Sequence, residues 1–405
     1  MIREITLEMA GAKMKVVKQS AFIAGVGQTE FTRHGGIMNR SQFQVAVEAV
    51  LAALEDAGMR AQDVDGFASF SNDSNESALM QVALGVPQMR WSSMVWGGGG
   101  GGSCAAIAQA AAAIQAGHAE TVVVYRGLCQ GQTRRFGRFG EGRTHGNFVH
   151  PYGLFAPAQM LALLVRRHMH LHPEIREEHL GMVAVNARSN ANRNPAAVMY
   201  GKPMTMNDYF SSRYIAEPLR LFDCCLETDG GCAIVVTTQA RARDARKRPV
   251  RILASKHGSG PGWGSGPLGS QNMPDEYYNS TNSRQLAREL FSAAGVTPAD
   301  IDVAQIYDHF SGMVLMALEE YGFCDVGGSG DFVSKGSIAW KTGKLPLNTS
   351  GGQLSEAYVH GMNVAIEGVR QLRGESTSQV DEAKLCLVTG GLGVSPTSAM
   401  IIGRD

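Results

Sequence analysis

The sequence predicts an α/β protein made of two duplicated halves, each of the βαβαβ type. A helical segment ending in Ala-Gly, a short loop, an Asp-x-Asp pattern and an apolar strand occurs in residues 43–70 and again in 284–308. A Gly-rich turn, a helical segment and an apolar strand follow in both halves, in residues 96–127 and 347–391. Alternating strands and helices favour mostly parallel sheets covered by helices. Chance similarity of two βαβ units is the alternative to duplication.

The elements of the first half are expected in a simple order. An opening strand (23–31) precedes the amphipathic segment 43–54, and the turn WGGGGGGSC (96–104) opens an Ala-rich helix that leads to the strand 121–127. Glycine allows backbone N–H groups and a helix N-terminus to approach a ligand closely. The Gly-rich turns are therefore the candidate ligand-binding segments.

Residues 129–221 have no counterpart in the second half, so they are interpreted as an insertion. The insertion begins with a basic run (134–143) and continues with amphipathic stretches at 156–168 and 177–195. A helical insertion of this kind caps a site or builds a subunit contact. The basic run is either a solvated surface or a contact for ligand phosphates. The second half begins with the strand VRILASKHG, which gives domains at 1–248 and 249–405.

Composition excludes several classes of function. The 405 residues contain 37 basic and 37 acidic side chains, which argues against nucleic acid or an anionic membrane as the main partner. The longest apolar runs are too short to span a bilayer, and the N-terminus lacks a secretory signal. Seven scattered cysteines without metal spacing indicate reduced thiols in a cytoplasmic protein, and no metal site is expected.

Several blocks together resemble the thiolase superfamily, in particular the sterol-carrier-protein-type thiolases and the thiolase-like aldolases of steroid side-chain degradation. The resemblance covers nearly the whole chain, and it is strongest in IAGVGQTEF (23–31), YGLFAPAQM (152–160), 211–236, QIYDHFSGM (305–313) and NTSGGQLSEAYVHG (348–361). It implies a layered αβαβα core with a helical loop insertion in the first half. It also implies a dimer that pairs through the strand after the nucleophile helix, here 121–126.

The residues that carry thiolase chemistry in this family are replaced. The position of the nucleophilic cysteine falls on Gly100, and Cys104 lies one turn deeper in the helix, as a relocated nucleophile or a packed thiol. The last Gly-rich loop offers Cys386 one residue early, which would point the thiol to the opposite face of the strand. Tyr307 and Tyr358 stand where the family commonly has histidines. Claisen chemistry needs two thiols and an imidazole, so the set argues against a thiolase.

A tyrosine pair at these positions is similar to the retro-aldolases that cleave β-hydroxyacyl-CoA steroid side chains. Such a reaction removes the β-hydroxyl proton, stabilises a thioester enolate and protonates its α-carbon, and a positioned phenol can relay these protons. Tyr307 is assigned as the group that receives the hydroxyl proton and Tyr358 as the group that protonates the enolate, with the reverse assignment open. His360 either takes part in catalysis or orients the loop.

Other residues are predicted to contact the substrate or its CoA moiety through backbone or side-chain groups. Backbone amides at the first Gly-rich turn would serve the enolate oxygen. His309 is interpreted as packing or as a pocket residue, and Asp308 as a partner of backbone amides. The complete set of predicted binding residues is Gly100, Gly101, His257, His309, Asn348, Gly351 and Gly352.

The resemblance therefore implies a lyase that releases a ketone or aldehyde and a short acyl-CoA such as propionyl-CoA or acetyl-CoA. No cofactor is expected beyond the coenzyme A of the substrate. The implied assembly is a homodimer with a separate DUF35-type protein (zinc ribbon and OB fold), which gives a heterotetramer. Two alternatives remain: a divergent thiolase that uses Cys104 or Cys386 with such a partner, and a non-catalytic lipid or acyl-CoA carrier.

Overall fold

The computed structural model describes residues 5–9, 12–16, 20–71, 73–96, 99–132, 150–263 and 279–404. The basic run at 134–143 lies outside the described residues, so the proposal that it contacts phosphates stays a prediction. Near the N-terminus, β1 (Ile5–Met9) and β2 (Ala12–Val16) pair as an antiparallel hairpin.

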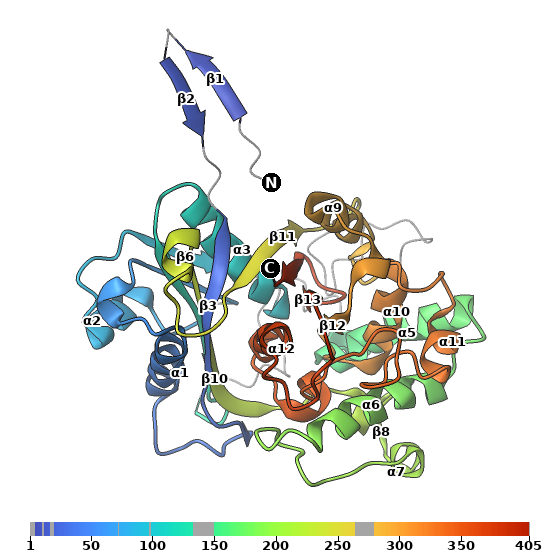
Figure 1. Cartoon of the computed structure of the whole chain (residues 1–405). Helices are drawn as coiled ribbons and strands as arrows, with labels where there is room; N and C mark the ends of the chain where they lie inside the picture. Colours follow the sequence, from blue (N-terminus) through green and yellow to red (C-terminus); the bar gives the residue numbers. More distant parts are fainter. Residues whose placement is uncertain are drawn as a thin grey trace.

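One continuous sheet runs through both halves (Figure 1). Starting from its middle, the first half contributes β3 (Ala21–Gln28), β10 (Thr228–Thr238), β7 (Thr121–Leu128), β5 (Gly66–Phe70) and β6 (Trp91–Val95). The second half contributes β11 (Val250–Gly258), β14 (Thr397–Gly403), β13 (Leu385–Gly390) and β12 (Val303–Gln305). In each half the order from the middle is opening strand, closing strand, the strand after the Gly-rich turn, and the strand after the first helix. The repeated order confirms the duplication.

The halves meet where β3 and β11 pair over a short antiparallel stretch, Ile23 with Val250 and Phe22 with Arg251. Residues 1–248 and 249–405 thus share a sheet, and their treatment as separate domains stays a prediction. Strand β4 (Thr32–Arg33) adds a short pairing to β10.

The expectation of mostly parallel sheets is wrong. Strand β5 is parallel to β6 and β7, and β12 is parallel to β13, but the remaining neighbours in the sheet are antiparallel. The reason is that the closing strands β10 and β14 do not follow a crossover helix. A tight turn joins β13 to β14, and such a connection makes neighbouring strands antiparallel.

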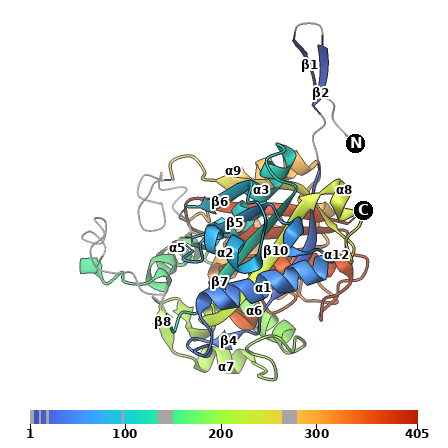
Figure 2. The same cartoon turned by 90° about the vertical axis from the view of Figure 1, so that its left-hand side faces the viewer.

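Helices cover both faces of each half and fill the space between them. Helix α1 (Gln42–Ala57) crosses the outer face of the first half (Figure 2), where it packs on β3, β10 and β7. Helices α3 (Gly102–Gln115) and α12 (Met362–Arg373) form the central layer between the halves. Helices α9 (Arg284–Ala294) and α10 (Ser311–Glu320) lie on the far side of the second half. This arrangement confirms the layered αβαβα core.

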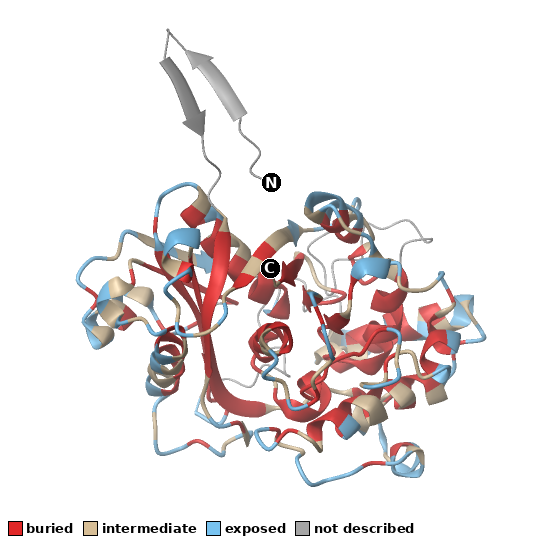
Figure 3. Cartoon of the chain, viewed as in Figure 1, coloured by how far each residue is buried: buried red, intermediate tan, exposed pale blue. Residues whose placement is uncertain are grey.

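Local sequence explains where the helices begin and end. Ser41 caps α1, because its Oγ accepts a hydrogen bond from the backbone N–H of Gln44 at 3.1 Å. The Ala-Gly signals work as expected: Gly58 and Gly295 end α1 and α9 in the left-handed region, at φ 70° and 71°. The central helices are almost completely buried (Figure 3), which fits the Ala-rich sequence of α3.

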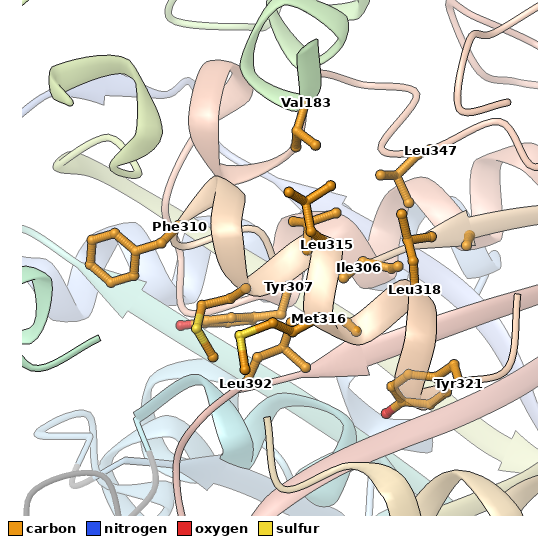
Figure 4. Packing of buried hydrophobic residues seen from close by; sticks show 14 of the residues in the cluster. Val183, Ile306, Tyr307, Phe310, Leu315, Met316, Leu318, Tyr321, Leu347 and Leu392 are labelled. Atoms are coloured by element: carbon orange, nitrogen blue, oxygen red, sulfur yellow. The ribbon is translucent and has the colours of Figure 1, made fainter. Parts of the chain in front are cut away.

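The insertion is largely helical, as predicted, with α5 (Pro157–Leu171), α6 (Glu177–Ala191) and α7 (Met206–Ser211). A small hairpin of β8 (Tyr214–Ala216) and β9 (Leu219–Arg220) follows these helices. Helices α5 and α6 pack on α10 of the second half and belong to the hydrophobic cluster that contains Ile306 and Tyr307 (Figure 4). The insertion thus covers the strand end that carries Tyr307.

The expected dimer strand, 121–126, is not available for pairing between copies. Strand β7 has β10 on one side and β5 on the other, so both of its edges are already hydrogen bonded. Within the described part of the chain, β6 is the strand at this end of the sheet. The smaller elements are α2 (Ser77–Leu84), α8 (Gln239–Ala242) and α11 (Ser329–Ser334). None of the described helices is both long and apolar enough to cross a membrane.

Candidate active site

Tyr307 lies just beyond the end of β12, where several hydrogen bonds fix the backbone. The Asn348 side chain accepts from the Ile306 N–H at 2.8 Å and donates to the Ile306 carbonyl at 2.9 Å. The Tyr307 N–H donates to Thr389 Oγ1 at 2.9 Å. The phenol ring is 2% exposed and packs beside Met316 and Leu392 (Figure 4). The ring is therefore held in one place before any ligand binds.

Tyr358 follows a π-helical turn (Gly352–Glu356) in the second Gly-rich block. Its N–H donates to Thr228 Oγ1 at 2.9 Å, and that hydroxyl donates to the Tyr358 carbonyl at 3.0 Å. The phenol is half-buried. Its hydroxyl accepts a hydrogen bond from the Tyr307 hydroxyl at 3.2 Å, across 51 residues of sequence. The structure brings together the two tyrosines that the sequence analysis singled out.

Gly100 lies directly against the Tyr307 ring. It belongs to a short 3-10 turn (Gly99–Gly101) that leads into α3. A Cβ atom on Gly100 would stand inside the phenol, against its Cζ, Cε2 and hydroxyl oxygen. Gly361 borders the same ring, because a Cβ there would lie 2.8 Å from Tyr307 Cδ2. Tyr307 thus fills the space that a side chain at position 100 would need.

The second Gly-rich block is shaped by two glycines with positive φ. Gly351 has φ 112°, and its missing Cβ leaves room for Ala191 of α6; Gly352 has φ 58° and lies against the Asp308 carboxylate. Asp308 accepts from the Gln353 N–H at 2.7 Å and from the Leu354 N–H at 3.4 Å. Burial raises the pKa of Asp308 to about 6. The prediction that Asp308 binds backbone amides is confirmed.

These contacts give several predicted binding residues a positioning role. Asn348 holds the chain before Tyr307, Gly351 and Gly352 shape the π-helical turn, and Gly101 lies against the Pro396 carbonyl. Contact of these residues with substrate or CoA stays a prediction.

Two buried imidazoles flank the phenols. The His360 ring lies 5.1 Å from the Tyr358 ring, centroid to centroid, at an interplanar angle of 80°. The His309 ring lies 5.0 Å from the Tyr307 ring, and its Nδ1 is 3.4 Å from the Tyr307 carbonyl oxygen. Burial lowers the pKa of His309 to about 4, and burial together with the Arg126 charge lowers that of His360 well below its usual value. Both rings are therefore neutral near pH 7.

His257 is placed differently from the other predicted site residues. It lies exposed on β11, opposite Ser398 of β14, and burial of part of its ring lowers its pKa. In the part of the chain that the structure describes, no hydrogen bond or ring contact connects His257 to the two phenols. Its assignment to CoA binding stays a prediction.

The surroundings shift the pKa values of the two phenols differently. Burial raises the pKa of both tyrosines. The hydrogen bond between them lowers the pKa of Tyr358, which accepts it, and raises that of Tyr307, which donates it. The Arg126 guanidinium also lowers the pKa of Tyr358. The Arg126 charge therefore favours the ionised form of Tyr358.

The sequence analysis missed two side chains near the phenols. Arg126 of β7 is 1% exposed, and a charged residue inside the apolar run TVVVYRGL could have drawn attention to it. Cys225 is half-buried, and its charged form would raise the pKa of both tyrosines. No sequence signal distinguishes Cys225 from its neighbour Cys224, which belongs to the rim of the adjacent hydrophobic cluster.

The two cysteines of the thiolase alternative are buried in the core. Cys104 is 0% exposed, its thiol lies 3.6 Å from the Val388 carbonyl oxygen, and burial raises its pKa to about 12. Cys386 is also fully buried, and it faces Gly368 of α12, where a Cβ would lie 3.2 Å from the sulfur. Burial raises its pKa well above the usual value. Thiols in this state are packing groups and poor nucleophiles.

Comparison with known proteins agrees with this geometry. Residues 269–404 match the model of the family "thiolase C-terminal domain-like". The human mitochondrial 3-ketoacyl-CoA thiolase superposes on 96% of this chain with a TM-score of 0.68 at 14% identity, which shows the fold. The chain therefore has the thiolase fold.

Two relatives of higher identity show the family to which the chain belongs. It is 43% identical over 396 residues to the 17-hydroxy-3-oxo-4-pregnene-20-carboxyl-CoA lyase of Mycobacterium tuberculosis, which covers 95% of this chain and 99% of that protein. It is 41% identical to the steroid side-chain-cleaving aldolase of Thermomonospora curvata, over 97% of this chain and 100% of that protein. The solved Ltp2-ChsH2(DUF35) aldolase superposes with a TM-score of 0.88 at 40% identity, over 96% of this chain and 99% of that one. The chain belongs to the family of thiolase-like, side-chain-cleaving aldolases.

Proposed function

We propose that this chain is a carbon–carbon lyase that cleaves the side chain of a steroid or bile acid in the form of its β-hydroxyacyl-CoA ester. The products are a ketone or aldehyde and a short acyl-CoA such as propionyl-CoA or acetyl-CoA. One observation carries the proposal: a buried and a half-buried phenol are hydrogen bonded at 3.2 Å, and the buried one, Tyr307, fills the space that a side chain at position 100 would need. The names of the relatives, a steroid acyl-CoA lyase and a steroid side-chain-cleaving aldolase, support the same reaction.

The reaction needs no acyl-enzyme. A base takes the proton of the β-hydroxyl group, the bond between the α- and β-carbons breaks, and its electrons pass into the thioester as an enolate. The α-carbon then takes up one proton and becomes the acyl-CoA product. One proton leaves the hydroxyl group and one proton arrives at the α-carbon. The reaction is therefore balanced, and no cofactor is required beyond the coenzyme A of the substrate. Backbone amides of the turn at Gly100 and Gly101 are the proposed donors to the enolate oxygen.

The hydrogen bond between the phenols suggests how the proton is returned. The Arg126 charge favours the ionised form of Tyr358, so we assign Tyr358 as the base for the β-hydroxyl group and Tyr307 as the acid for the α-carbon, which reverses the order favoured by sequence alone. After one turnover Tyr358 carries an extra proton and Tyr307 lacks one. Transfer across the 3.2 Å hydrogen bond restores both groups. His360 and His309 would support the phenols as neutral rings.

The proposed assembly includes a second polypeptide. The solved relative is named as a complex of Ltp2 with ChsH2(DUF35), and we propose a DUF35-type partner for this chain as well. A homodimer carrying two such partners gives a heterotetramer. We further propose that the assembly works in the cytoplasm and binds neither nucleic acid nor membrane, in line with its balanced charge.

The test is a cleavage assay with the full chain and its DUF35-type partner on a β-hydroxyacyl-CoA steroid, followed by mass spectrometry of the ketone and acyl-CoA. Tyr307→Phe and Tyr358→Phe should each lower kcat by roughly 10²- to 10⁴-fold, the usual contribution of a general acid or base. Tyr321→Phe is the matched control, because Tyr321 is also buried and belongs to the same hydrophobic cluster as Tyr307. Substrate left intact by the complete assembly, or full activity in both Phe variants, would contradict the proposal.

A further inference from the structure

Arg126 reaches the central layer of the molecule from β7. Alternate residues of a strand point to opposite faces, and Val122 and Val124 belong to the cluster around α3 and α12. Val123 and Tyr125 belong to the cluster beneath α1 on the other face. Arg126 therefore points into the layer between the two halves, where the Gly-rich turn and the phenol pair lie.

A short series of contacts connects Arg126 to Tyr358. The guanidinium donates to the Phe70 carbonyl oxygen at 2.7 Å and lies 5.4 Å from the centre of the Phe70 ring. The Phe70 ring is 6.4 Å from the His360 ring, which is 5.1 Å from the Tyr358 ring. These contacts place a buried positive charge on the side of the pair that carries Tyr358.

The charge is balanced within the protein rather than by water. Arg126 is 1% exposed and forms an ion pair with the Asp73 carboxylate at 3.3 Å. A buried ion pair of this kind contributes little net stability, and apolar residues of the same volume often replace it without loss. Stability alone is therefore a weak reason for an arginine here, and a role for its charge is the stronger one.

We propose that Arg126 is an electrostatic positioning residue, whose buried charge makes Tyr358 the phenol that ionises and stabilises the negative charge that passes through the pair during cleavage. This inference rests on the proposed function, since it gives the lyase reaction its base. Arg126 does not need to touch the substrate, because its charge acts on the phenols across the ring contacts.

Among the described residues, the other groups that influence the pair oppose its ionisation or are neutral. Cys225 and Glu227 raise the pKa of Tyr358, and Asp308 raises that of Tyr307. His309 and His360 carry no charge near neutral pH. The Arg126 charge lowers the pKa of Tyr358. Burial lowers the pKa of Arg126 itself, while the Asp73 carboxylate and a charge on either phenol raise it.

The experiment compares Arg126→Gln with Arg126→Lys in the full chain, with difluorotyrosine placed at position 358. Fluorine lowers the pKa of a phenol, so its ionisation can be followed by ¹⁹F NMR at a pH at which the fold persists. At fixed pH, Arg126→Gln should lower the ratio of phenolate to phenol at position 358 by about tenfold or more, and Arg126→Lys should restore most of it. Asp73→Asn should raise the ratio, because it removes the negative charge that faces Arg126.

Turnover by the assembly with its partner provides the second measurement. In Arg126→Gln the rise of kcat/KM with pH should move to higher pH, with kcat reduced and KM little changed, and Arg126→Lys should recover the parent profile. If Arg126→Gln does not fold, the opposite shifts expected for Asp73→Asn and the recovery in Arg126→Lys decide the question. A folded Gln variant with unchanged titration and unchanged pH profile would overturn the inference and leave Arg126 as a tie to the Phe70 carbonyl.

The two readouts separate this inference from the proposed function. The titration of position 358 needs no turnover, so a shift in an assembly that cleaves no acyl-CoA would support the electrostatic role and reject the lyase. An active lyase in which the phenol at position 358 titrates independently of Arg126 would support the proposed function and reject the electrostatic role.

Discussion

The Tyr307 ring and a side chain at position 100 cannot occupy the same space. Adding one methyl group at position 100 tests this. In Gly100→Ala the new Cβ would stand inside the Tyr307 phenol, whereas carbon atoms pack at about 3.5–4.0 Å. The 3-10 turn at Gly100 is followed directly by the buried helix α3, so the backbone has little room to withdraw. The phenol must therefore move away from Tyr358.

The structure sets the size of the effect. Overpacking of this kind costs about 1–3 kcal/mol of folding stability. Loss of the 3.2 Å hydrogen bond between the phenols adds about 1 kcal/mol. Because the displaced phenol can no longer exchange a proton with its partner, kcat should fall by roughly 10²- to 10⁴-fold. Gly100→Cys should behave in the same way and should gain no thiolase activity.

The assay measures cleavage kinetics and denaturant unfolding for Gly100→Ala, with Gly258→Ala as the control, since a Cβ on Gly258 meets nothing within 4 Å. A double-mutant cycle with Tyr307→Ala identifies the clash. Once the ring is absent, Gly100→Ala should cost little further stability. Cleavage within a few-fold of the parent, or the same stability loss with and without the Tyr307 ring, would refute the reasoning.

Three further predictions use other groups. Cys104→Ser should retain lyase activity within about threefold in the cleavage assay, because the buried thiol is a packing group; inactivation of a folded variant would restore the thiolase alternative. The pKa of His309, lowered to about 4 by burial, predicts that the kcat/KM profile shows no imidazole ionisation between pH 5 and 8. Burial raises the pKa of Glu356 to about 7, so the stability that its protonated form contributes is present below about pH 4 and is lost as pH rises through 7. Glu356→Gln should therefore flatten the dependence of Tm on pH between 4 and 8, and an unchanged slope would count against this assignment.

Sequence patterns predicted those parts of the fold that depend on local signals. Ala-Gly helix ends, alternation of segments and the two Gly-rich turns are local, and they predicted α1, α9 and the repeated strand order. The direction of strands and the position of sheet edges depend on how distant segments pair. For this reason the sequence analysis was wrong about the mostly parallel sheet and about strand 121–126 as the dimer contact.

The candidate site shows the same difference between what local patterns predict and what depends on distant contacts. Tyr307 and Tyr358 could be chosen because each stands at a recognisable place in a motif, and the structure brings them together. Arg126 and Cys225 approach the pair from β7 and from the segment before β10, and no pattern within either segment indicates which ring it will face. The pKa of a buried group depends on the charges and polar groups packed around it, and only the folded structure shows which groups these are.

The position of Tyr307 also constrains how a thiolase-like scaffold can change its reaction. A cysteine at position 100 and a phenol at position 307 need the same volume, so one substitution cannot produce an enzyme with both. Restoring acyl transfer would require a smaller residue at 307, and the phenol pair would then be lost along with its proton exchange. A lyase of this geometry and a thiolase are therefore separated by at least two coupled changes, with an impaired site in each single variant. We expect Tyr307→His/Gly100→Cys to be better folded than Gly100→Cys alone, which denaturant unfolding of the two proteins can decide.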